Sequence, residues 1–324
     1  MTHGLVLGKF LPYHNGHAHL IRSARRQVDR LTVLVCSVRR EPIAGGERSQ
    51  WVRAAHPDCR VVHVSDEVPQ APEDDPAFWP IWTALVGRYA GPVDLVFTSE
   101  AYGDELARRL GARHVPVDPA RRTVPVSGTA VRADPMAEWE FLPEVVRPYF
   151  VRRVALVGAE SVGKTTLAAA LAAHFGTAWV PEYARTFCET RHARALLPVD
   201  LESIAWGQAA WEDAAARRAN RVLLCDTELH TTCTWSDLLV GGRPLWLTRA
   251  AQARRYDLVL HLAPDVPWVD DGTRVLAGRR AEHDRRLGAE LAAAGRNVRV
   301  LRGPFAQRFA SACEAVAALL ARPG

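Results

Sequence analysis

The sequence predicts an α/β protein that is built from two parallel-sheet domains. The chain has 324 residues, which is longer than a single hydrophobic core usually serves. Each half opens with a short apolar run, then a glycine-containing turn and a segment of helical periodicity, an order that is typical of parallel sheets. The second such unit begins near residue 150, and residues 143–149 resemble a short linker. We therefore expect one domain at residues 1–149 and another at residues 150–324.

The charged residues are compatible with small anionic ligands. The net charge is +5, but the arginines are spread along both halves, and one basic run of the kind that binds nucleic acid is not seen. Of the 41 basic residues only Lys9 and Lys164 are lysines, and each lies inside a phosphate-type motif. This usage suggests that a compact ammonium is kept where a point charge is needed.

The amino terminus and the apolar segments predict a cytoplasmic protein without a membrane partner. The chain starts without a basic leader and a long apolar segment, and no apolar run reaches bilayer length. The six cysteines form no CxxC pairs, so neither a disulfide framework nor a zinc site is indicated. The sequence does not reveal the oligomeric state, and a homo-oligomer is compatible with it.

The most informative stretch has the pattern GxxxxGK[ST] of a phosphate-binding loop, with Gly158, Glu160, Ser161, Val162, Gly163, Lys164, Thr165 and Thr166. An apolar β-branched run precedes it and an apolar helical segment follows, which is the context that this loop requires. Its glycines let successive backbone N–H groups converge on a polyphosphate, and the helix N-terminus adds partial positive charge. We expect Lys164 at the β- and γ-phosphates of ATP and Thr165 at Mg²⁺.

A second phosphate-type motif follows the first strand of the chain and comprises Gly8, Lys9, Phe10, His14, Gly16 and His17. Its two histidines flank a glycine where a helical pattern begins. Imidazoles at this position can donate hydrogen bonds to phosphate oxygens, while the helix dipole and the lysine add positive potential. The motif is therefore suited to a triphosphate.

A later helix start carries Ser127, Gly128, Thr129 and Arg132. The hydroxyls and the neighbouring backbone N–H groups are placed to hold distal phosphates, and the arginine one turn further can neutralise a leaving pyrophosphate.

Together, GKFxPxHxGH near the amino terminus and SGTxVR later in the chain resemble the nucleotidylyltransferase superfamily, and nicotinamide mononucleotide (NMN) adenylyltransferases in particular. The segment 45–48, GGER, resembles the part of that family that lines the nucleotide site. The resemblance implies a Rossmann-like domain in which the NMN phosphate attacks the α-phosphorus of ATP in line and releases pyrophosphate. It assigns His14 and His17 to the ATP phosphates, and Lys9 to the attacking phosphate or the triphosphate. Ser127, Thr129 and Arg132 are then assigned to pyrophosphate.

An acidic, proline-rich loop at residues 69–76 precedes Phe78, Trp79 and Trp82. The loop could serve as a lid with an aromatic stacking face for a ligand. We favour the alternative, in which the tryptophans pack on the next helix, because aromatic clusters more often belong to a core.

In the second half, Glu182, Tyr183 and Arg185 follow a short strand where a P-loop kinase is expected to bind its acceptor. A carboxylate at a strand end can hold ribose hydroxyls and an arginine can neutralise phosphate, although an exposed ion pair explains the same residues equally well.

The apolar strand at residues 222–225 ends in Asp226, which is predicted either to orient Mg²⁺ or to act as the base for the acceptor hydroxyl. Beyond residue 269, Arg274 and Arg279 resemble the lid arginines of nucleoside kinases, with a solvated helix face as the alternative. The predicted catalytic residues of the two halves are thus Lys9, His14, His17, Lys164 and Asp226.

Nearly the whole chain resembles the bifunctional NMN adenylyltransferase and ribosylnicotinamide kinase of the NadR type. Family members that also repress transcription carry a helix-turn-helix module ahead of the transferase, whereas here the first strand begins within the first residues, which argues against DNA binding. The implied substrates are ribosylnicotinamide, NMN and ATP, with Mg²⁺. Three alternatives remain: another nucleotidylyltransferase fused to a different small-molecule kinase, a nucleotide-sensing regulator with little catalysis, and a nucleic-acid-binding protein.

Overall fold

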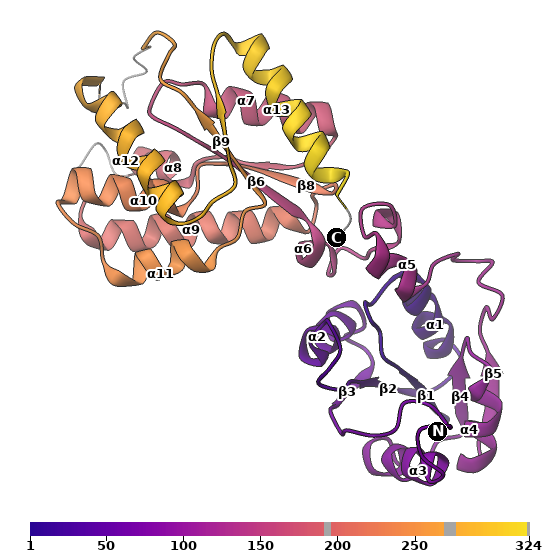
Figure 1. Ribbon diagram of the computed structural model, residues 1–324. Helices are drawn as coiled ribbons and strands as arrows, with labels where there is room; N and C mark the ends of the chain where they lie inside the picture. The colour runs from indigo at the N-terminus through magenta and orange to yellow at the C-terminus, as the bar shows by residue number, and fades with distance from the viewer. Residues whose placement is uncertain (191–195, 269–276, 323–324) are drawn as a thin grey trace. The chain divides into compact units, whose positions relative to one another are not determined.

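Two five-stranded parallel sheets form the framework of the chain, each in its own unit (Figure 1). The computed structural model describes residues 1–190, 196–268 and 277–322. The units divide between Val146 and Arg147, within the predicted linker. The prediction of two parallel α/β sheets is confirmed, while the domain bounds 1–149 and 150–324 stay a prediction.

The first unit has the strand order β3-β2-β1-β4-β5. Its elements are β1 (His3–Gly8), α1 (Asn15–Arg25), β2 (Arg30–Cys36), α2 (Gly45–Ala55), β3 (Arg60–Val64), α3 (Phe78–Tyr89), β4 (Leu95–Thr98), α4 (Tyr102–Leu110), β5 (Arg113–Pro116), α5 (Gly128–Ala133) and the 3₁₀ turn η1 (Trp139–Phe141).

The central strand β1 is buried on both faces, since Leu5 and Val6 have no exposed surface. One face of the sheet packs on α3 and α4 through side chains that include Leu85 and Leu106. Helix α1 covers the opposite face (Figure 1). A strand enclosed in this way reads as a continuous apolar run, which is why β1 is recognisable in the sequence.

The second unit has the order β10-β9-β6-β8-β7. Its elements are α6 (Arg147–Phe150), β6 (Arg152–Val157), α7 (Lys164–Phe175), β7 (Trp179–Val180), α8 (Tyr183–Glu189), α9 (Pro198–Ala216), β8 (Val222–Asp226), α10 (Leu229–Trp235), the π-helical segment η2 (Ser236–Val240), α11 (Leu245–Ala253), β9 (Leu258–Leu262), η3 (Ala277–Arg279), α12 (Arg280–Ala293), β10 (Val298–Leu301) and α13 (Phe305–Leu320).

Helices α7 and α13 cover one face of this sheet, and α9 covers the other (Figure 1). The core between α7, α13 and the strands contains Leu156, Leu167 and Val316, which are at most 1% exposed. In the described part of the chain no helix is both long and apolar enough to span a bilayer.

We predict that Gly158→Ala destabilises the second unit by about 1–3 kcal/mol. Gly158 has φ +141°, and an added Cβ would lie 2.6 Å from the carbonyl oxygen of Leu262 in the neighbouring strand. The measurement is scanning calorimetry of the full chain. Gly288→Ala is the control, because its Cβ would meet only ordinary contact at 3.7 Å from His261 within a helix. Equal melting temperatures for the two variants would contradict the prediction.

Candidate functional site

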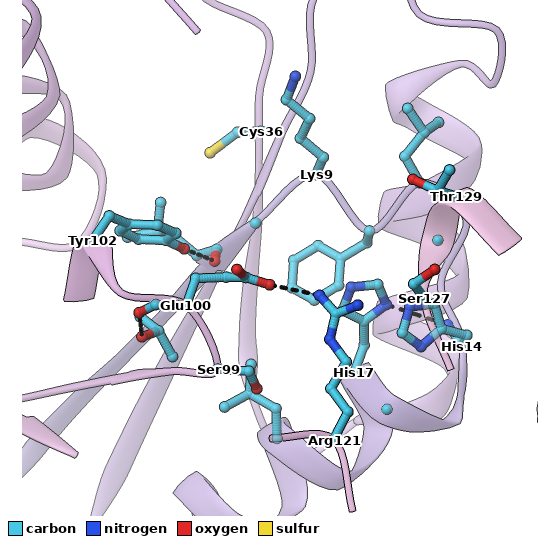
Figure 2. A pocket seen from close by; sticks show the side chains of 18 of the residues that line it. Lys9, His14, His17, Cys36, Ser99, Glu100, Tyr102, Arg121, Ser127 and Thr129 are labelled. Carbon is cyan, nitrogen blue, oxygen red and sulfur yellow. Dashed lines mark hydrogen bonds and ion pairs between the residues drawn. The ribbon is translucent and has the colours of Figure 1, made fainter. Parts of the chain in front are cut away.

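A cavity of about 680 Å³ lies in the first unit and is lined by residues at the ends of β1 and β4 and at the start of α1 and α5. All ten predicted transferase ligands line it, namely Gly8, Lys9, Phe10, His14, Gly16, His17, Ser127, Gly128, Thr129 and Arg132. Figure 2 shows the histidines, the hydroxyls and the lysine facing this space. Residues more than one hundred positions apart in the chain therefore meet at one site.

The rings of His14 and His17 stack at the N-terminus of α1, with centroids 3.7 Å apart. The backbone N–H of His14 donates a hydrogen bond of 3.3 Å to Nδ1 of His17. Because Nδ1 accepts this bond, a neutral His17 carries its proton on Nε2. That proton is available to a phosphate oxygen.

Burial and neighbouring charge keep both imidazoles neutral. Burial, aided by the positive charge of Arg121, lowers the pKa of His14 from 6.5 to about 4. Burial first, and then His14 and Arg121, lower the pKa of His17 well below its ordinary value. Nδ1 of His14 is buried without a hydrogen-bond partner among the described residues. The pair thus offers neutral hydrogen-bonding groups rather than two imidazolium charges.

Lys9 is held at the cavity by a carboxylate that the sequence did not reveal. Its Nζ lies 3.4 Å from Oε1 of Glu41. The other oxygen of Glu41 accepts a hydrogen bond of 2.6 Å from Arg48, which also donates 2.6 Å to the carbonyl oxygen of Lys9. Arg48 is fully buried, and segment 45–48, expected at the nucleotide site, is not among the residues that line the cavity. Its arginine instead fixes the backbone of the lysine.

The hydroxyl motif, residues 127–132, forms another part of the cavity wall. Ser127 caps α5 by accepting a hydrogen bond of 3.1 Å from the backbone N–H of Ala130. Arg132 donates to the hydroxyl of Thr129 at 3.2 Å and to the carbonyl oxygen of Leu11. The guanidinium thereby joins α5 to the loop that follows β1.

Several cavity residues were missed by sequence reasoning, because no motif marks them. Arg121 has φ +49° and donates a hydrogen bond of 2.8 Å to Glu100, and its guanidinium lies beside the histidines in Figure 2. Asp118 accepts hydrogen bonds from the backbone N–H groups of residues 122–124, which shapes the loop that carries Arg121.

The aromatic cluster of α3 packs against protein groups and also borders the cavity. Phe78, Trp79 and Trp82 line the cavity. Trp79 also lies under the guanidinium of Arg109 in α4, at 5.2 Å, and Trp82 donates 2.9 Å to the carbonyl oxygen of Pro69. The tryptophans therefore pack on the next helix and also form part of the cavity wall; stacking on a ligand stays a prediction.

In the second unit, the phosphate-binding loop joins β6 to α7, and it has positive φ at Gly158, Ser161 and Gly163. The loop includes Glu160 and Val162, and Thr166 lies in the first turn of α7. Nζ of Lys164 donates to the carbonyl oxygens of Gly158 and Ala159, each at 3.1 Å. The ammonium therefore lies over the concave side of its own loop, where phosphate oxygens can replace the carbonyls.

The hydroxyl of Thr165 donates a hydrogen bond to Oδ2 of Asp226 at the end of β8. Oδ1 of Asp226 is buried and has no hydrogen-bond partner among the described residues. Burial and the charge of Glu182 raise the pKa of Asp226 to about 6. A hydroxyl and a carboxylate with an unused oxygen are the hard oxygen donors that Mg²⁺ prefers, so these residues fit the ion.

Two arginines that sequence reasoning missed hold the backbone of the loop. Arg308 of α13, which is 3% exposed, donates 2.8 Å to the carbonyl oxygen of Val162. Arg280 at the start of α12 donates 3.2 Å to the carbonyl oxygen of Ser161. Of the predicted lid arginines, Arg279 pairs with Glu282 at 2.9 Å and donates to Leu238, whereas Arg274 lies outside the described residues.

The predicted acceptor residues follow β7 and lie near Asp226. The charges of Glu182 and Arg185 both act on the Asp226 carboxyl. The backbone N–H of Tyr183 donates 2.9 Å to the side chain of Gln208 in α9, and its ring meets that of Trp211 edge-on at 4.8 Å. Helix α9 thus fixes the start of α8.

These features define a nucleotide-binding α/β protein in which a nucleotidyltransferase-like unit is joined to a P-loop unit. The first unit matches the cytidylyltransferase-like family over residues 5–134, and the second matches an AAA domain family over residues 153–308.

The chain is 32% identical to the trifunctional NAD biosynthesis/regulator protein NadR of Escherichia coli (strain K12), over 85% of this chain and 72% of that protein. It is 31% identical to the protein of the same name from Salmonella typhimurium, over 84% of this chain and 72% of that one. The chain therefore belongs to the NadR family, and the resemblance inferred from its motifs is confirmed.

A crystal structure of a NadR protein in complex with NR shares the fold, with a TM-score of 0.82 at 22% identity over 100% of this chain and 97% of that chain. The Rossmann-like and P-loop architectures predicted for the two halves are thus confirmed.

We predict that His14 does not titrate near neutral pH in the ligand-free protein. Because its folded pKa of about 4 lies below the ordinary 6.5, the unfolded state binds more protons between these values. The stability linked to the neutral ring is therefore present above pH 6.5 and is lost as the pH falls toward 4. An NMR titration, with the resonance assigned through His14→Asn, measures this directly. A midpoint near 6.5 would rule out the neutral pair.

Proposed function

We propose that this chain is a bifunctional enzyme of NAD biosynthesis. The second unit phosphorylates ribosylnicotinamide with ATP to give NMN, and the first unit transfers the adenylyl group of a second ATP to NMN to give NAD and pyrophosphate. The observation that carries the proposal is the convergence of all ten motif residues on one cavity, in a chain that also holds a P-loop with its partner aspartate. Family membership supports the choice of substrates.

In the first unit, catalysis is attributed to positioning and charge neutralisation. The Nε2–H group of His17 donates a hydrogen bond to a phosphate oxygen of ATP beside His14. Lys9 exchanges its contact with Glu41 for the phosphate of NMN or the triphosphate. Ser127, Thr129 and Arg132 hold the leaving pyrophosphate at their part of the cavity wall.

In the second unit, the loop amides and Lys164 hold the β- and γ-phosphates of ATP. Thr165 and Asp226 would hold Mg²⁺, which neutralises charge on the phosphates when bound. Glu182, Tyr183 and Arg185 are proposed to bind the acceptor, because they lie next to the aspartate. The proposed partners are small molecules, and the proposed location is the cytoplasm; DNA binding and a particular oligomeric state form no part of the proposal.

Two substitutions are predicted to separate the activities. Lys164→Ala should abolish phosphorylation of ribosylnicotinamide and spare adenylylation of NMN, while His17→Ala should do the reverse, because each residue belongs to its own unit. ADP formation is measured with ATP and ribosylnicotinamide, and pyrophosphate formation is measured with ATP and NMN. Circular dichroism checks that each variant is folded. Loss of both activities in a folded variant would refute the two-site account.

Replacement of Asp226 by asparagine is predicted to slow the kinase by on the order of 100-fold or more. The amide keeps a hydrogen-bond partner for Thr165 but removes the negative charge. ADP formation is followed while the Mg²⁺ concentration is varied. Partial recovery at high Mg²⁺ identifies a metal ligand, a constant deficit identifies a base, and undiminished activity would exclude both roles.

A further inference from the structure

Several buried polar atoms without hydrogen-bond partners lie at the end of β8 and on helices α10 and α12 of the second unit. In the described part of this unit they include Oδ1 of Asp226, the hydroxyls of Thr227 and Thr231, and both ring nitrogens of His283. Asp226 and Thr227 end β8, Thr231 lies in the first turn of α10, and His283 lies in α12. Because buried polar groups in proteins are nearly always hydrogen-bonded, such a concentration of exceptions indicates a surface that is completed by a ligand.

His283 is the least expected member of this group. His283 is 1% exposed, yet neither nitrogen of its ring has a hydrogen-bond partner in the described structure. No sequence motif marks it, and its helix α12 begins directly after the predicted lid residue Arg279. An imidazole buried in this state loses its hydrogen bonds to water without compensation, which is costly unless a bound molecule restores them.

The ring is held firmly between two helices. It packs on Trp235, the last residue of α10, with centroids 4.6 Å apart. Helix α10 is capped by Glu228, which accepts hydrogen bonds from the backbone N–H groups of His230 and Thr231. His230 is also tied to Glu290 of α12 at 3.1 Å. Since the ring packs on Trp235 and the two helices are linked through His230 and Glu290, His283 has little freedom to find another partner.

His283 lies near the phosphate-binding loop. Lys164 is close enough for its charge to act on the imidazole, and the neighbouring Asp284 accepts a hydrogen bond of 2.8 Å from Nε2 of His261 in β9. Burial, aided by the charge of Lys164, lowers the pKa of His283 to about 4, so the ring is neutral at physiological pH. Trp235 lies four residues beyond Thr231, on the same face of α10.

We infer that His283 is an acceptor-contacting residue of the kinase site, which hydrogen-bonds the hydroxyl or amide groups of the nucleoside that is phosphorylated. A neutral imidazole has one N–H donor and one bare nitrogen acceptor. Both are satisfied by a group that donates and accepts, as hydroxyls and carboxamides do, whereas phosphate oxygens only accept. The unpartnered hydroxyls of Thr227 and Thr231 have the same dual character. The inference rests on the proposed kinase function and adds a specificity residue to it.

The test compares His283→Phe and His283→Gln with the wild type in the full chain. Initial rates are measured with ribosylnicotinamide and ATP varied separately, and the melting temperature is measured without ligands. Phenylalanine keeps a ring against Trp235 and removes both nitrogens. Because those nitrogens bond to no described residue, we expect an unchanged or higher melting temperature, a KM for ribosylnicotinamide raised about tenfold, and a KM for ATP within about twofold of wild type. Glutamine should recover part of the affinity.

Arg286→Gln is the matched control, because Arg286 lies on the exposed side of the same helix and pairs with Glu282 at 2.6 Å. It should leave both KM values unchanged. An unchanged KM for ribosylnicotinamide in the phenylalanine variant, or an equal rise in the KM for ATP, would overturn the inference. If phenylalanine impairs folding, the glutamine variant decides: wild-type stability with a raised KM supports the inference, and lowered stability with an unchanged KM assigns His283 a structural role. A wild-type protein that does not phosphorylate ribosylnicotinamide would overturn the proposed function and this inference together.

Discussion

The carboxyl end of a central parallel strand is the place on which both candidate sites depend. In each unit the strand that comes first in sequence occupies the middle of the sheet. This strand is β1 in the first unit and β6 in the second. The neighbouring strands then lie on both sides, so the loop after the first strand opens where the strand order reverses. The phosphate-type motifs follow β1 and β6 directly. At these two places the turn after the strand and the N-terminus of the next helix lie at the crevice in the sheet edge.

Each site holds the ammonium group of its lysine against protein oxygens. Lys9 pairs with Glu41, and Lys164 donates to two carbonyls of its own loop. Lys164 thus keeps two hydrogen bonds and Lys9 keeps an ion pair. Phosphate oxygens can take over these bonds, so the lysines are positioned in advance. His14 and His17 of the first site stack without charge repulsion because both rings are neutral.

Much of this arrangement could be predicted from the sequence, because local patterns set it. The strands β1, β6 and β8 are apolar runs with distinctive turns, and the histidine, hydroxyl and P-loop motifs have fixed spacings. The residues that escaped prediction act through tertiary contacts that have no fixed spacing. Glu41 pairs with both Lys9 and Arg48, and Arg308 reaches the P-loop from the last helix. His283 lies in a helix of ordinary composition, and only its burial without partners distinguishes it.

One chain is thus proposed to carry two consecutive ATP-dependent reactions at separate sites. The most direct measurement incubates the purified protein with Mg·ATP and ribosylnicotinamide and follows the products over time by mass spectrometry. The account predicts that ribosylnicotinamide phosphate forms first and is then converted to NAD⁺ with release of pyrophosphate. Two results would contradict the proposed pair of reactions: ribosylnicotinamide that is not consumed, or ribosylnicotinamide phosphate that is never converted to NAD⁺.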